Sequence, residues 1–151
     1  TNVGRPVIDR SSKLQVVLKN AVSFPGSAGF DFSEEAVLSS DDNDADMVLE
    51  QTTDGLIMFV PEDGDIRDFG RTNSIDDIST APRSGWAETK SVLLGVEHSY
   101  AVRTWDEKCY KFRVAAVWQD SILFDWAELA VPGNAVLRQT RSQSVANKFP
   151  Q

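Results

Sequence analysis

Cysteine and histidine are almost absent from this chain, which contains one of each, Cys109 and His98. A single cysteine excludes a disulfide within the chain. As a general base, His98 would need an activated nucleophile and an orienting acid nearby, and the sequence spacing offers neither. We interpret His98 as a strand-edge or turn residue and Cys109 as a structural thiol. The sequence therefore predicts a protein that is not an enzyme and needs no organic cofactor.

Long apolar runs and a basic net charge are missing as well. No apolar run exceeds five residues, as in Leu56–Val60, whereas a membrane-spanning helix needs about 20. No transmembrane segment is therefore predicted. The formal net charge of −8 argues against nucleic acid as a partner, because such binding relies on Lys and Arg at the phosphates. Walker loops, dinucleotide fingerprints and zinc-ligand spacings do not occur.

The charge is unevenly distributed along the chain. Residues 31–68 contain thirteen acids and one base, Arg67. Both ends are basic instead. The bases near them include Arg5, Arg10, Arg138, Arg141 and Lys148. No acid follows Glu128, so basic ends flank an acidic middle.

Period-two patterns predict an all-β fold, a single antiparallel β-sandwich or barrel-like domain with extended termini. We expect an N-terminal extension over 1–12, a β domain over 13–128 and a tail or arm over 129–151. Strands are expected within 13–22 and at 30–32, 46–51, 55–60 and 91–94. Residues 66–91 form a mixed stretch, in which Ile75–Ile78 favours one helical turn capped by Ser74.

The clearest pattern lies between residues 99 and 127, where three alternating segments are joined by short polar turns. It predicts a three-stranded antiparallel meander with one buried face, which includes Tyr110, Phe112 and Trp126. The opposite face is expected to carry cross-strand charge pairs. The residues expected in those pairs are Arg103, Lys111, Arg113 and Asp125.

This meander resembles a hairpin motif of exported bacterial β domains, a set that includes the HmuY-like haem-binding lipoproteins. The matching residues are Tyr100-Ala-Val-Arg103-Thr104 and Lys108-Cys-Tyr-Lys111-Phe-Arg-Val114, and the resemblance spans residues 29–127. Glu107 stands where the motif has a turn glycine, and Cys109 where it has a tyrosine. The resemblance implies an exported, mostly β module that is secreted, periplasmic or on the cell surface. Haem ligation does not carry over, because a pair of axial histidines would be expected and His98 is alone.

Two groups of side chains are candidate binding residues. Asp42, Asp44 and Asp46 alternate as at the start of a calcium loop, but Met47 and Thr53 break the EF-hand pattern. A solvated acidic turn is the favoured interpretation there, and a different type of calcium site is the alternative. Trp105 and Trp118 sit at strand ends, where packing is favoured and exposure would indicate stacking on a sugar ring.

The sequence as a whole favours a structural or assembly subunit outside the cytoplasm, in a surface layer, filament or complex. Its basic ends would bind the acidic β domain of a protein partner or of another copy. The alternative is a binding module for carbohydrate or a haem-like small molecule.

Overall fold

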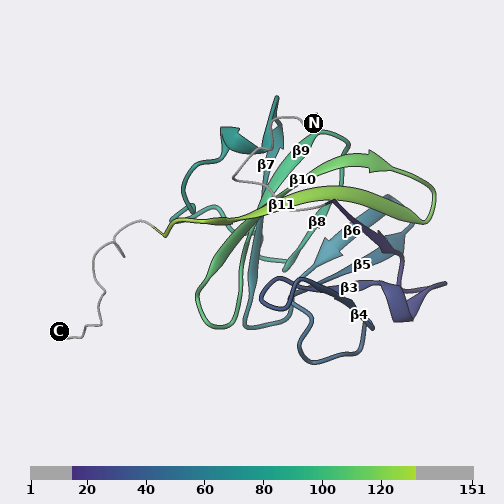
Figure 1. The fold of residues 1–151 in the computed structure, drawn as a ribbon. Helices are drawn as coiled ribbons and strands as arrows, with labels where there is room; N and C mark the ends of the chain where they lie inside the picture. The colour runs from purple at the N-terminus through teal and green to yellow at the C-terminus, as the bar shows by residue number, and fades with distance from the viewer. Residues whose placement is uncertain (1–14, 132–151) are drawn as a thin grey trace, which may run out of the picture.

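The computed structural model describes residues 15–131, which form a β-sandwich (Figure 1). The first sheet has the strand order β2-β11-β10-β9-β7 and the second has the order β4-β3-β5-β6-β8. Pairing within both sheets is antiparallel. The all-β prediction is confirmed, in its sandwich form.

The strands of the first sheet are β2 (Val16–Lys19), β7 (Asp65–Arg71), β9 (His98–Arg103), β10 (Cys109–Val117) and β11 (Ser121–Leu129). Those of the second sheet are β3 (Gly29–Asp31), β4 (Ala36–Leu38), β5 (Met47–Thr52), β6 (Gly55–Phe59) and β8 (Ser91–Leu93). Two 3-10 turns, η1 (Pro25–Ser27) and η2 (Ile75–Asp77), complete the described elements. Ser74 caps η2, where its side chain accepts a hydrogen bond from the Asp76 N–H, so the predicted helical turn is confirmed. Within residues 15–131, no helix is long and apolar enough to cross a bilayer.

The predicted meander is present as β9, β10 and β11. Phe112 lies opposite Tyr100 on one side and Trp126 on the other, so the alternating aromatic positions fall into register. These rings face the second sheet, where Phe30 packs edge-on against Phe124 and Trp126. The sandwich core therefore forms between the aromatic face of the meander and strands β3, β5 and β6.

The other face of the meander carries a cross-strand charge pair for one of the expected residues, between Arg103 and Asp65 on β7, but it is largely covered instead of open to solvent. The chain between β7 and β8 crosses it and buries a second apolar cluster that includes Ile78, Ala101 and Cys109. Lys111 is only 4% exposed, and its Nζ donates to the carbonyl oxygens of Ile75 and Ile78. The expectation of a single buried face was wrong, because alternation shows that a position faces away from the core but not what covers it.

Strand β7 was not predicted, because residues 65–71 were interpreted as part of a mixed stretch. Ile66 is its only fully buried apolar residue, and the pairing with β9 shifts register between Asp68 and Arg71. Its charged side chains serve the edge of the sheet: Asp65 accepts hydrogen bonds from Arg103 on β9 and from Lys90. Edge strands commonly carry such charges, which weakens their apolar alternation.

Candidate functional site

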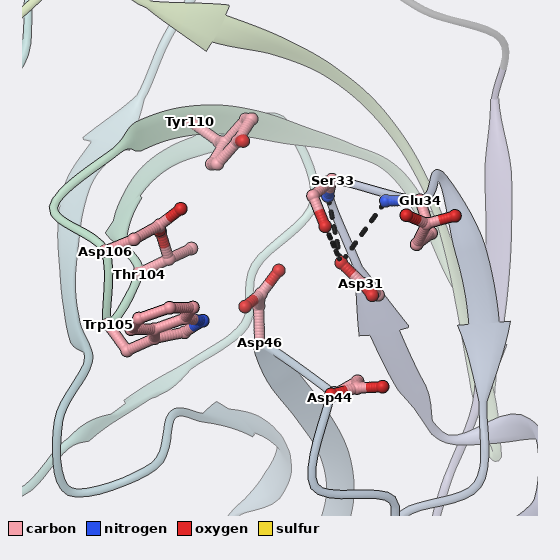
Figure 2. Close-up of a pocket in the computed structure, with 9 residues that line it drawn as sticks. All are labelled: Asp31, Ser33, Glu34, Asp44, Asp46, Thr104, Trp105, Asp106 and Tyr110. Carbon is pink, nitrogen blue, oxygen red and sulfur yellow. Dashed lines mark hydrogen bonds between the residues drawn. The ribbon is translucent and has the colours of Figure 1, made fainter.

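A hollow of about 220 Å³ opens where the turn between β9 and β10 faces the ends of β3 and β5 (Figure 2). Its lining residues are Asp31, Ser33, Glu34, Asp44, Asp46, Thr104, Trp105, Asp106 and Tyr110. Five of these nine carry a carboxyl group, and none carries a basic group. Its volume lies below the range typical of sites for drug-sized ligands, so it fits one side chain or one small ring.

Asp31 ends β3 and shapes the inner wall of the hollow. It is 6% exposed, and its Oδ1 accepts hydrogen bonds from the Ser33 N–H (2.9 Å) and the Ser33 hydroxyl (2.8 Å). The Glu34 N–H donates to the same oxygen at 3.3 Å. Such a side-chain-to-backbone turn is the usual role of an aspartate directly after a strand.

Asp46 stands beside Asp31, just before β5. The Phe32 N–H donates to its Oδ2 at 2.9 Å, which favours the charged form of the carboxyl group. Burial nevertheless raises the pKa of Asp46 to about 6, and the charges of Asp31 and Asp106 raise it further against that hydrogen bond. An acid held in this way gains stabilisation from any cation that enters the hollow.

Tyr110 carries the one hydroxyl of the hollow that has no hydrogen bond within residues 15–131. The side chain is 6% exposed, and its ring stacks on Phe32 with centroids 4.5 Å apart. Burial, together with nearby acids, raises the pKa of this hydroxyl to about 12, so it remains protonated at neutral pH. Figure 2 shows the Tyr110 ring beside the same open space as Asp46 and Asp106. The hydroxyl oxygen is open to the hollow, because within residues 15–131 the one buried side-chain polar atom without a partner is Trp86 Nε1. A ligand in the hollow can therefore form a hydrogen bond with this hydroxyl.

Trp105 forms the outer rim at the tip of the β9–β10 hairpin. Its side chain is 71% exposed, so the favoured prediction that it packs at the sheet edge was wrong. It also lines a second hollow of about 110 Å³, together with Asp46, Asp63 and Thr104. A large exposed ring beside a cavity is a common feature of binding sites.

A third hollow of about 230 Å³ adjoins the first on the side away from Trp105. The two share Ser33 and Tyr110 as lining residues. Its acids are Glu35 and Glu128, and its one base is Lys108. The first hollow therefore lies between two others and shares walls with both.

The structure separates the three aspartates that formed the alternative calcium site. Asp44 and Asp46 line the first hollow, whereas Asp42 does not and instead accepts a hydrogen bond from the Asp44 N–H at 2.9 Å. Within residues 15–131, no group of three or more His, Cys, Asp and Glu side chains is placed to hold a metal ion.

The remaining candidates lie away from the hollows. Trp118 is 52% exposed at the opposite end of β10 from Trp105, so the packing prediction was wrong for it too. Cys109 is buried, and this burial raises the pKa of its thiol to about 11, which suits the structural role predicted for it. His98 has an acid beside it, since its Nδ1 lies 3.1 Å from Asp68 Oδ1. The spacing of the two residues in the sequence did not reveal this pair. The five basic candidates, Arg5, Arg10, Arg138, Arg141 and Lys148, lie outside the described residues.

Comparison of the chain with protein-family models, with curated proteins and with solved structures finds no match. The likeness to exported β domains therefore stays a prediction from the hairpin residues. Sequence reasoning did not select Asp31, Asp106 or Tyr110 as binding residues. The one signal for Asp31 was its position between Phe30 and Phe32, where it interrupts two buried rings.

Proposed function

We propose that this protein is a non-enzymatic binding module of an assembly outside the cytoplasm, and that its first hollow accepts a basic side chain of a partner polypeptide. The observation that carries the proposal is the Tyr110 hydroxyl, which ends a largely buried side chain, opens into the hollow and has no hydrogen-bond partner within residues 15–131. It stands among five carboxyl groups with no base in the lining. The extracytoplasmic location rests on the hairpin resemblance alone.

A guanidinium group fits this chemistry better than a neutral or anionic one. It offers five N–H donors to the surrounding carboxylates, and such charge-assisted hydrogen bonds are about twice as strong as neutral ones. The phenol oxygen of Tyr110 can accept one of these bonds, or its hydroxyl can donate to a peptide carbonyl. The exposed ring of Trp105 offers a face on which a guanidinium can stack.

The first test uses a short blocked peptide, acetyl-Gly-Arg-Gly-amide, with the citrulline peptide as a matched ligand that lacks the charge. Isothermal titration should show an affinity on the order of 0.1–1 mM for the arginine peptide at low salt, as expected for a single small contact. We expect citrulline to bind at least about tenfold more weakly, because its neutral ureido group cannot form the charge-assisted hydrogen bonds of a guanidinium. Equal binding of the two peptides, or binding of neither, would contradict the proposal.

The Tyr110→Phe variant separates binding from folding. The lost hydroxyl has no partner within residues 15–131, so thermal stability should stay equal or rise. Affinity for the arginine peptide should nevertheless fall several-fold. Trp105→Ala should weaken binding as well, whereas Trp118→Ala, which changes a similarly exposed ring outside the hollows, should not. Unchanged affinity in Tyr110→Phe would remove this hydroxyl from the site.

Carbohydrate is the second candidate ligand, and the exposed ring of Trp105 is the observation that favours it. A sugar can stack on the indole while its hydroxyl groups donate to Asp46 and Asp106. Salt distinguishes the two ligands, because screening weakens the binding of a cation but leaves that of a neutral sugar almost unchanged. A glycan panel read by tryptophan fluorescence, repeated at low and high salt, decides between them.

A further inference from the structure

The three hollows adjoin one another in a row. The second and first share Asp46, Thr104 and Trp105, and the first and third share Ser33 and Tyr110. A ligand that fills all three must be elongated, with Trp105 near one end and Glu128 near the other. We call this row the acidic groove.

The charge of the groove selects the type of elongated ligand. Eight of its lining residues are acids, and Lys108 is the only base. An extended peptide with several bases would match these carboxylates and also present backbone carbonyls to the unpartnered Tyr110 hydroxyl.

Residues 132–151 of this chain have that composition. They include Arg138, Arg141 and Lys148 and no acid. The described chain ends at Val131, three residues after Glu128, which lines the third hollow. At about 3.3 Å per residue, a 20-residue segment reaches up to about 66 Å, far enough to meet a neighbouring molecule.

The positions of the last described residues, Ala130 and Val131, favour the groove of a second copy over the chain's own groove as the binding site of the basic segment. Ala130 forms a bridge to Thr80 and accepts a hydrogen bond from the Ala81 N–H at 2.9 Å. Val131 packs against the second apolar cluster, on the face of the meander opposite the sandwich core. The last described residues thus lie on the outer face of the first sheet, whereas the groove opens between the sheets.

We infer that the acidic groove binds residues 132–151 of a second copy, so that the protein assembles with itself through its own basic segment. This inference rests on the proposed function, because it names the partner of the same site. Reciprocal exchange of the segment would give a closed dimer, and one-way insertion would give an open chain of subunits.

A charge-swap experiment with the full chain tests the inference. Glu34→Lys/Asp44→Lys reverses two exposed acids of the groove, and Arg138→Glu/Arg141→Glu reverses two bases of the segment. In sedimentation velocity at low salt, the wild-type chain should associate with rising concentration. Each variant alone should show an association constant at least about tenfold weaker, because acid then meets acid or base meets base. An equimolar mixture of the two variants should restore association to within about threefold of wild type, since attraction returns in both groove–segment pairings.

Controls distinguish this inference from the proposed function. Asp54→Lys/Glu88→Lys makes the same change in net charge at exposed sites outside the groove and should leave association unchanged. A chain that stays monomeric, or one whose variants do not recover on mixing, overturns the inference. If the arginine peptide still binds in that case, the proposed function stands without self-assembly. If the peptide also fails to bind, both are wrong.

Discussion

Within residues 15–131, four residues other than glycine adopt a left-handed backbone, and Glu107, with φ of 65°, is the one in the hairpin beside the candidate site. A side chain in this region costs about 1 kcal/mol relative to glycine. Glu107 also stands where the hairpin motif that this chain resembles has glycine. We therefore expect Glu107→Gly to raise the free energy of unfolding by about 0.5–1 kcal/mol, measured by urea denaturation.

Glu107→Ala is the matched control, because it removes the same charge but keeps the Cβ atom. It should leave stability close to that of wild type. An equal gain in both variants would assign the effect to the charge of Glu107 and not to its backbone.

Asp46 gives stability a pH dependence whose sign follows from its raised pKa. In the folded protein the Asp46 carboxyl keeps its proton up to a pH of about 6, whereas in the unfolded chain it loses the proton near its ordinary pKa of 3.8. Folding is therefore penalised increasingly as the pH rises from about 4 to about 6, and the penalty is constant above that range. Asp46→Asn keeps an oxygen for the Phe32 N–H and should be more stable than wild type at pH 8 by about 1–2 kcal/mol, a value reduced from the full shift because the carboxyl is partly solvated.

Thermal unfolding of both proteins between about pH 4 and pH 8 checks this prediction. Asp65 titrates in the opposite sense: burial alone would raise its pKa, but hydrogen bonds from Arg103 and Lys90 outweigh burial and lower it. Both proteins contain Asp65, so its contribution cancels when the stability of wild type is subtracted from that of Asp46→Asn. A stability difference that does not change with pH would contradict the assigned pKa.

At the scale of elements, Lys111 joins η2 to the meander. Its ammonium group donates to Ile75 and Ile78 at 3.0 and 2.8 Å, and it is the one charged side chain of β10 that is buried. Lys111→Met leaves both carbonyls without this donor, and we expect a loss of about 2–3 kcal/mol. Hydrogen exchange should show faster opening of residues 72–81. Lys108→Met, at an exposed position in the preceding turn, should change neither quantity.

A strand could be predicted from the sequence when several of its alternate side chains face the same core. Strand β10 alternates Tyr110, Phe112 and Val114 toward the core, and its prediction is confirmed. Strand β7 has one such residue, Ile66, so a pattern search has too little signal to detect it. The covered outer face of the meander could not be predicted either, since it depends on where the chain after β7 crosses the sheet.

At the scale of the whole molecule, the candidate site combines segments that are distant in sequence. Asp31 belongs to β3, Asp46 to the turn before β5, and Tyr110 to β10. Only the packing of the two sheets brings these three side chains together. The sequence did reveal an acidic middle segment and selected Trp105 and two of the acids, Asp44 and Asp46. It could not reveal that the Tyr110 hydroxyl lacks a partner within residues 15–131, because that depends on the contacts of a buried ring.

The proposed function predicts that this molecule releases a basic ligand as the pH falls. Arginine stays protonated throughout, so any change in affinity between pH 7.5 and pH 5 must come from the protein. Asp46, with a pKa of about 6, takes up a proton in this interval, so one of the five carboxyl groups around the hollow loses its negative charge. Calorimetry with the arginine peptide should therefore show an affinity about three- to tenfold weaker at pH 5 than at pH 7.5, the range of a single weakened charge pair. Asp46→Asn should bind weakly at both values, with a nearly flat profile between them. If the wild-type affinity does not fall on acidification, or if Asp46→Asn follows the same curve, the cation does not pair with this carboxyl group, and a neutral sugar becomes the better candidate.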